Sequence, residues 1–207
     1  MKERLLLDKI DYKQGTIKLG GKEYPLNDTY FPTIDPKDPY KLTQEEEDVV
    51  ERLKNSFLGS ERLQRHIRFL YTKGSLYKVY NGNLLYHGCV PLNEDGSFMK
   101  VKIFDKMYSG KALYDILEHY ARKGYYSIDP QEKQRGEDIL WFIWKNKHSP
   151  VFGKERMATF ERYFVDATET HEEPKNAYYR LFEKEEIVDK IQKEFGLPVQ
   201  GAHIING

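Results

Sequence analysis

The stretch that decides the fold is Asn83–Leu92, which reads NLLYHGCVPL. A short apolar run follows the turn signal Asn81-Gly82 and ends at His87, a pattern typical of a buried strand in a β-hairpin. In α/β sheets the carboxyl ends of strands line the crevice where ligands bind. The sequence therefore predicts that His87 faces such a crevice, and that Gly88 lets the backbone turn there and leaves room for a bound group.

Composition limits the class of protein. The chain has 207 residues, 39% hydrophobic and 32% charged, a balance that suits one globular domain or a domain with a helical extension. Lys plus Arg and Asp plus Glu number 33 each, so no net charge favours nucleic acid or an anionic membrane as partner. No apolar run approaches the ~18 residues of a membrane span, and the leucines after Met1–Arg4 are too few for a signal peptide. A single cysteine, Cys89, excludes an internal disulfide and predicts a cytoplasmic location.

Residues 1–40 are predicted to form a first region, a β-hairpin region followed by a proline-rich loop. Three prolines within residues 27–40 exclude regular structure there. Before this loop, glycines separate three short alternating runs, which predicts a β-meander; the runs are residues 10–12, 16–19 and 23–26.

Residues 41–207 are predicted to form the second domain, which begins with two amphipathic helices. Thr43-Gln44-Glu45-Glu46 is a capping box, and Gly59-Ser60 separates the first helix from the second. A hairpin of residues 76–80 and 84–86 then delivers His87, and residues 98–104 predict another strand.

A helical insertion is predicted over residues 110–197. Apolar residues recur at helical spacing in several segments; these are residues 113–120, 157–164, 174–181 and 184–195. The segment Ile139–Trp144 is apolar nearly all round, so we expect its helix to lie deep in the core. The last residues, His203–Gly207, predict a terminal apolar strand.

His87 is the leading candidate for a metal ligand because of its position at a strand end. The pattern alone also allows a histidine that only caps the strand. Four further histidines lie in polar or local structural surroundings and are interpreted as structural: His66, His119, His171 and His203. No zinc-type Cys/His cluster and no HExxH, Walker A or GxGxxG motif occurs. Cys89, without an evident neighbouring base, is interpreted as a buried thiol.

A second stretch of interest is Ser149–Arg156, with the sequence SPVFGKER. A glycine loop before a helix, with Lys154 and Arg156 at its mouth, suits a phosphate group. A glycine before a basic helix is also common without any ligand. Both interpretations stay open on the pattern alone.

Three stretches together resemble the class III fructose-1,6-bisphosphatases of bacteria, which belong to the calcineurin-like metallophosphoesterases: Asn83–Leu92, Phe152–Phe164 and His203–Gly207. The resemblance covers nearly the whole chain. It implies an α/β (α+β) fold, namely part of a metallophosphoesterase β-sandwich with a large helical segment. It also implies hydrolysis of the 1-phosphate of fructose 1,6-bisphosphate, the gluconeogenic step, at a two-metal site that usually holds Mn²⁺.

The resemblance also implies roles for individual residues. Tyr86-His87-Gly88 is similar to the late His-Gly motif of the superfamily, whose histidine is a metal ligand. Lys154, Arg156 and Arg162 become candidates for phosphate binding, and Gly88 and Asn206 would shape the site. No residue is assigned as catalytic.

The departures from the family pattern lead to a further expectation. The early ligand motifs Gly-Asp-x-His, Gly-Asp-x-x-Asp-Arg-Gly and Gly-Asn-His-Asp/Glu are absent, and the chain stops at Asn206-Gly207, where the family continues with a Gly-His motif. We therefore expect a piece of a longer enzyme that is inactive, or nearly so, by itself. Its expected partner is a sugar bisphosphate, not nucleic acid or membrane, and a homo-oligomer is left open.

Two other functions stay open on the sequence. One is another sugar-phosphate or protein phosphatase of the same superfamily, because the residues that select the substrate are not identified. The other is a non-catalytic α/β interaction module that kept the fold and lost the metals, which the missing aspartate motifs fit equally well.

Overall fold

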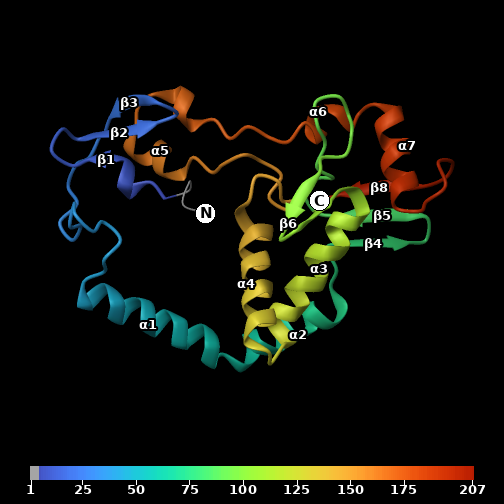
Figure 1. The fold of residues 1–207 in the computed structure, drawn as a ribbon, viewed down its shortest axis with the longest axis horizontal. Helices are drawn as coiled ribbons and strands as arrows, with labels where there is room; N and C mark the ends of the chain where they lie inside the picture. Colours follow the sequence, from blue (N-terminus) through green and yellow to red (C-terminus); the bar gives the residue numbers. More distant parts are fainter. Residues whose placement is uncertain (1–4) are drawn as a thin grey trace. The chain divides into compact units, whose positions relative to one another are not determined.

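The computed structural model describes residues 5–207, which form two compact units. The first contains residues 5–68 and 157–172, and the second residues 69–156 and 173–207. Residues 5–207 contain both helices and three small sheets (Figure 1), so the predicted mixed α+β class is confirmed. The signal-peptide question at Met1–Arg4 lies outside the described residues. The compact units do not test the predicted domain boundary after residue 40 or the predicted helical insertion at residues 110–197, so both stay predictions.

The first unit is built on the predicted β-meander. After the short 3₁₀ helix η2 (Leu7–Lys9), the strands β1 (Ile10–Asp11), β2 (Thr16–Leu19) and β3 (Lys22–Pro25) pair antiparallel in that order. A later segment, with α5 (Thr159–Phe164) and the 3₁₀ helix η3 (Thr168–His171), packs on them, since Val165 is buried in the same core as Ile17. The Asn27 amide also donates to the Phe164 carbonyl oxygen over 2.8 Å.

Two long helices follow the proline-rich loop. In α1 (Gln44–Gly59) the Glu46 amide donates to the Thr43 hydroxyl over 3.3 Å, and the Thr43 amide donates to the Glu46 carboxylate over 2.8 Å. The predicted capping box is therefore confirmed. Helix α2 (Glu61–Lys73) begins two residues later and crosses from the first unit into the second. All residues of α1 and α2 are described, and none is buried.

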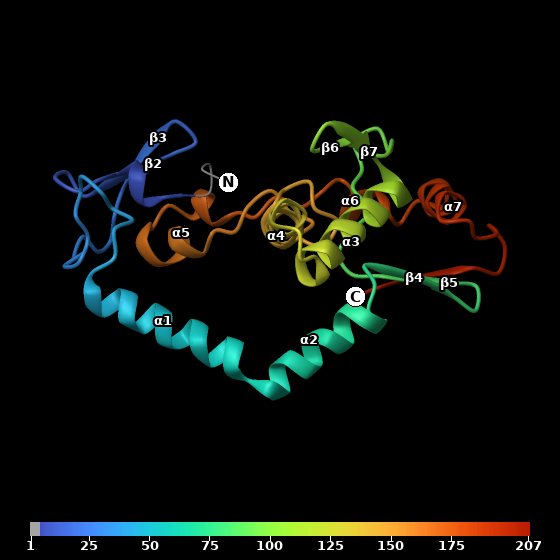
Figure 2. The same cartoon turned by 60° about the horizontal axis from the view of Figure 1, so that its bottom comes forward.

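The main sheet of the second unit contains β4 (Tyr77–Tyr80), β5 (Asn83–Tyr86) and β8 (His203–Asn206), in the order β4-β5-β8. The β4–β5 pair is the predicted hairpin, and its turn residues Asn81 and Gly82 both have positive φ, as tight hairpin turns require. Strand β8 runs parallel to β5, so residues about 120 positions apart lie side by side (Figures 1 and 2).

The rest of the second unit is a hairpin and a set of helices. The hairpin consists of β6 (Val101–Ile103) and β7 (Lys106–Tyr108), so the strand predicted at 98–104 is shorter than expected. The helices are α3 (Gly110–Tyr126), α4 (Pro130–Lys145), α6 (Tyr178–Leu181) and α7 (Glu185–Glu194). The helix predicted at 174–181 shortens to α6, because residues 174–176 pair with the loop at 153–155 instead.

The prediction that the helix with Trp141 and Trp144 lies deep in the core is wrong. The two side chains are 44% and 66% exposed. Helix α4 packs on α3 through Gly136, where an added Cβ would lie 2.1 Å from the Gly124 nitrogen. The two backbones approach each other too closely for side chains at this point. The indole rings therefore remain outside the contact and pack against each other at a tilt of 43°, with centroids 5.2 Å apart.

Within residues 5–207, none of the helices has both the length and the apolar character that crossing a membrane requires.

Candidate functional site

The carboxyl ends of β5 and β8 lie side by side in the second unit, because Tyr86 is opposite Asn206 in the parallel pair. His87 is the first residue after β5, and its side chain is exposed. The Gly207 amide donates to the Tyr86 carbonyl oxygen over 3.3 Å, and the Gly88 amide to the Gly207 carbonyl oxygen over 3.4 Å. Two of the three stretches singled out in the sequence therefore meet next to His87.

Gly88 is required by the backbone at this point. Its φ is +88°, a left-handed value that disfavours every residue with a Cβ. An added Cβ would also lie 2.2 Å from the Pro150 carbonyl oxygen. The next amide, at Cys89, donates to the same oxygen over 2.7 Å. The loop at residues 149–156 is thus packed directly on the turn that follows His87.

A polar network lies behind this turn, with two buried phenols and, at its exposed end, Asn206. The Asn206 side-chain amide donates to the Gly88 carbonyl oxygen over 2.9 Å and to the Tyr178 hydroxyl over 3.1 Å. The Tyr178 and Tyr86 hydroxyls are 2.6 Å apart. Burial raises the pKa of both phenols above the usual range, so they stay neutral near pH 7. The network is held by neutral hydrogen bonds and not by charge.

Lys154 lies in the loop that packs on this turn, but its ammonium is already paired. Its Nζ is 2.5 Å from a carboxylate oxygen of Glu173, and both side chains are largely buried. The loop is held in place by two backbone hydrogen bonds, from Glu155 to Pro174 over 2.8 Å and from Asn176 to Gly153 over 2.9 Å. A phosphate at Lys154 would compete with Glu173.

The two arginine candidates lie in different units. Arg156 is half-buried in the second unit and makes contacts of its own. Arg162 is on α5 in the first unit, where its guanidinium donates to the His171 carbonyl oxygen over 3.3 Å. The structure therefore does not bring Arg162 together with Lys154 within one compact unit.

The residues present do not fit a metal centre by themselves. Over residues 5–207, no group of three or more His, Cys, Asp or Glu side chains is placed to hold a metal ion. A two-metal phosphatase site needs several such ligands, and His87 can supply only one. Elsewhere, the His171 ring nitrogen lies 2.7 Å from the Val165 carbonyl oxygen and the His119 ring packs edge-on against Tyr120, as structural histidines do.

Cys89 is a buried thiol, as predicted. Its side chain has no exposed surface, and burial raises its pKa to about 12. A thiol that stays protonated at neutral pH is a poor nucleophile. Cys89 therefore belongs to the core beneath the turn.

Sequence reasoning missed two residues of this region, Asn176 and Tyr178. The Asn176 side-chain oxygen accepts from the amides of Leu92, over 3.0 Å, and Tyr178, over 2.9 Å. It thereby ties the end of the Asn83–Leu92 stretch to the start of α6. The available signal was an asparagine just before a short aromatic run, a position where the side chain bonds to nearby backbone amides.

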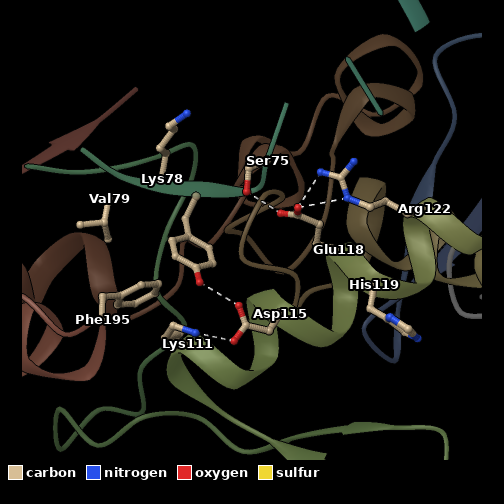
Figure 3. A pocket seen from close by; sticks show the side chains of 10 residues that line it. Ser75, Lys78, Val79, Lys111, Asp115, Glu118, His119, Arg122 and Phe195 are labelled. Carbon is tan, nitrogen blue, oxygen red and sulfur yellow. Dashed lines mark hydrogen bonds and ion pairs between the residues drawn. The ribbon is translucent and has the colours of Figure 1, made fainter. Parts of the chain in front are cut away.

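A separate groove of about 660 Å³ runs along α3 and β4 of the second unit. Figure 3 shows the Ser75 and Arg122 side chains directed at Glu118, with donor–acceptor distances of 2.5 and 2.7 Å. The Lys111 ammonium is likewise 2.6 Å from Asp115. These hydrogen bonds and ion pairs involve both carboxylates of the groove, Glu118 and Asp115.

Comparison with known proteins identifies the family. The model of the family described as Firmicute fructose-1,6-bisphosphatase matches residues 1–207 of this mixed α+β chain. The chain belongs to this family, and the resemblance expected from the sequence is confirmed. The family implies a divalent metal, although the described residues alone do not form a site for it.

Individual relatives are longer than this chain. It is 53% identical over 207 residues to "Fructose-1,6-bisphosphatase class 3 1" of Clostridium beijerinckii, and 55% identical over 208 residues to "Fructose-1,6-bisphosphatase class 3" of Clostridioides difficile. The alignments include the whole of this chain but 31% and 32% of the relatives. The chain therefore spans about a third of the length of these relatives. No solved structure matches it.

Proposed function

We propose that this chain forms part of the phosphatase domain of a longer fructose-1,6-bisphosphatase with a calcineurin-like fold. The activity would be hydrolysis of the 1-phosphate of fructose 1,6-bisphosphate, a gluconeogenic step carried out in the cytoplasm. The observation that carries the proposal is the family match over residues 1–207, together with relatives that bear this name. The packing of two of the matching stretches supports it, because residues 83–92 and 203–207 meet in one compact unit, where the loop at residues 149–156 packs on the same turn.

His87 would supply one metal ligand, with Mn²⁺ as the expected metal. Its exposed side chain at the end of a strand, beside the end of a parallel neighbour, is the position where α/β sheets place ligand-binding groups. The other ligands would come from the parts of the polypeptide that the relatives have and this chain does not span. This division of ligands would explain why His87 does not belong to a group of three or more ligand-type side chains among residues 5–207.

The phosphate-binding proposals differ in what each would require. Lys154 would have to exchange Glu173 for a phosphate oxygen, whereas Arg156 would act from the same loop. Arg162 would act from the first unit. Gly88 and Asn206 would shape the site by fixing the turn after His87.

The proposal can be tested with a chimera in which this chain replaces the matching 207 residues of the Clostridium beijerinckii relative. We expect the chimera to release phosphate from fructose 1,6-bisphosphate. His87→Ala should lower kcat by about 100-fold or more, as loss of a group that assembles the site does, while His119→Ala should leave kcat nearly unchanged. An active His87→Ala chimera would remove His87 from the site. An inactive unsubstituted chimera would instead favour the non-catalytic interaction module.

A further inference from the structure

The peptide group between Gly88 and Cys89 is held from both sides. Its carbonyl oxygen accepts from the Asn206 side chain over 2.9 Å, and its N–H donates to the Pro150 carbonyl oxygen over 2.7 Å. Because a peptide group is planar, these two hydrogen bonds together fix its orientation. This orientation sets the conformation of Gly88, and with it the direction in which the chain leaves His87.

The backbone alone links the two strand ends weakly. The hydrogen bonds between Gly88 and Gly207 and between Gly207 and Tyr86 measure 3.4 and 3.3 Å, longer than the usual 2.9–3.0 Å. The Asn206 side-chain bond to Gly88 is shorter than either. The amide of Asn206 is therefore the closest link between the end of β8 and the turn after His87.

Tyr178 keeps this amide in place. Its hydroxyl is the second acceptor of the Asn206 amide, at 3.1 Å, and the phenol is 1% exposed. The ring stacks on Phe182 with centroids 5.5 Å apart, and its own backbone amide is held by Asn176. The Tyr178 hydroxyl thus occupies a fixed point in the core, whereas Asn206 lies on an exposed edge strand.

We infer that Tyr178 is a positioning residue for His87, which acts through Asn206 on the Gly88–Cys89 peptide group. This inference rests on the proposed function, because the turn after His87 has a role in the reaction only if His87 is a metal ligand. In the proposed role, Tyr178 contacts neither the substrate nor the metal. Its hydroxyl orients the side chain that orients the turn.

The Tyr86 hydroxyl provides a matched control. Tyr86→Phe and Tyr178→Phe each remove one phenolic oxygen and break the same 2.6 Å contact. Only Tyr178→Phe also removes the acceptor of Asn206. A purely structural role in the core would make the two variants equivalent, whereas a positioning role makes them different.

The first experiment uses NMR on the 207-residue chain. In Tyr178→Phe, the Cys89 amide should exchange with solvent about tenfold faster, the factor expected for loss of one hydrogen bond, and the His87 ring resonances should shift. In Tyr86→Phe both should stay close to those of the unsubstituted chain. Equal behaviour of the two variants, or no change in either, would overturn the inference.

A second variant covers the case in which Tyr178→Phe does not fold. Asn206→Ala, at an exposed position, leaves both phenols intact and should reproduce the faster exchange at Cys89. In the active chimera, Tyr178→Phe should lower kcat by about 10- to 100-fold with little change in KM, as misplacement of a reacting group does. Unchanged kcat would overturn the positioning role. An inactive unsubstituted chimera would count against the proposed function alone, because the NMR comparison still decides whether Tyr178 fixes the turn.

Discussion

Asn206 on β8 donates its side-chain amide to the carbonyl oxygen of Gly88, at the end of β5, over 2.9 Å. The two residues are 118 positions apart in the sequence. Their contact explains why a short terminal strand and a mid-chain His-Gly step belong to one feature. The candidate site is therefore a property of the parallel β5–β8 pair and not of either stretch alone.

Replacing Gly88 should destabilise the second unit strongly. Gly88→Ala places a Cβ 2.2 Å from the Pro150 oxygen and imposes a left-handed conformation on alanine. The conformational cost is ~1–2 kcal/mol and overpacking adds ~1–3 kcal/mol, so we expect a loss of about 2–5 kcal/mol in the free energy of unfolding. Urea denaturation measures this change.

Gly196→Ala is the control for Gly88→Ala. Its φ is +78°, but nothing lies within 4 Å of an added Cβ. It should cost only the conformational part, about 1–2 kcal/mol. Equal losses in the two variants would show that the contact with Pro150 relaxes and that Gly88 is not needed for close packing.

The sequence predicted the strand-end turn well because its signals are local. Asn81-Gly82 specifies a tight hairpin turn, and a short apolar run that ends at His87-Gly88 specifies a strand and its exit. The parallel partner β8 was predicted as a strand, but its pairing with β5 depends on contacts between distant residues. Tyr178 and Asn176 were missed for the same reason, since their role exists only when α6 lies against the turn.

The helix pair α3–α4 should depend on a glycine and not on its tryptophans. Gly136→Ala would gain ~1 kcal/mol of helix propensity, but a Cβ 2.1 Å from the Gly124 nitrogen costs ~3 kcal/mol or more. We expect a net loss of about 2 kcal/mol in unfolding free energy. Trp144→Ala, at a 66% exposed position, should cost less than about 1 kcal/mol. The reverse order of the two losses would contradict the observed packing.

The tryptophan helix shows where pattern reasoning failed. A run of apolar residues around a whole helix normally means burial, but the composition does not say which face approaches another helix. Here the contact runs through Gly136 and Ile139, and the bulky residues beyond Ile139 remain partly exposed. The signal that was overlooked is the pair Gly124 and Gly136, which permits close backbone approach.

Glu118 should make the stability of the second unit depend on pH. Burial, the largest single effect, would raise its pKa, but hydrogen bonds from Ser75, Arg122 and the Leu76 amide outweigh it and lower the pKa below 4.5. A carboxylate whose pKa is lower in the folded state contributes stability above its unfolded pKa and loses it as pH falls through the folded pKa. The stability difference between the unsubstituted chain and Glu118→Gln should therefore be largest near pH 7 and shrink as the pH falls below the ordinary Glu pKa of 4.5 and through the lowered pKa of the folded state.

Urea denaturation across this pH range measures the Glu118 effect. Ser75→Ala removes one of the hydrogen bonds to the carboxylate and should reduce the pH dependence without abolishing it. A stability difference for Glu118→Gln that stays constant from pH 7 to about pH 3 would mean that the carboxylate is not stabilised in the folded state.

Cys89 should resist alkylation in the folded chain. Its thiol is fully buried, so a reagent cannot reach it. Because its pKa is raised to about 12, the thiol also stays protonated at pH 8, and the reactive thiolate does not form. Reaction with iodoacetamide should be slower by about 100-fold or more than in urea-unfolded chain, and mass spectrometry counts the adducts. Rapid labelling of the folded chain would show that the core beneath the turn opens readily.

We propose that His87 contributes one ligand to a metal site that the rest of a longer polypeptide completes. The isolated 207-residue chain should bind Mn²⁺ only weakly and release no phosphate above background, since residues 5–207 hold no cluster of three or more His, Cys, Asp or Glu side chains that could hold a metal ion. The most direct measurement is the metal content of the Clostridium beijerinckii chimera by elemental analysis after dialysis. We expect bound metal in the unsubstituted and His119→Ala chimeras and a clear loss of metal in His87→Ala. Full metal occupancy in His87→Ala would contradict it.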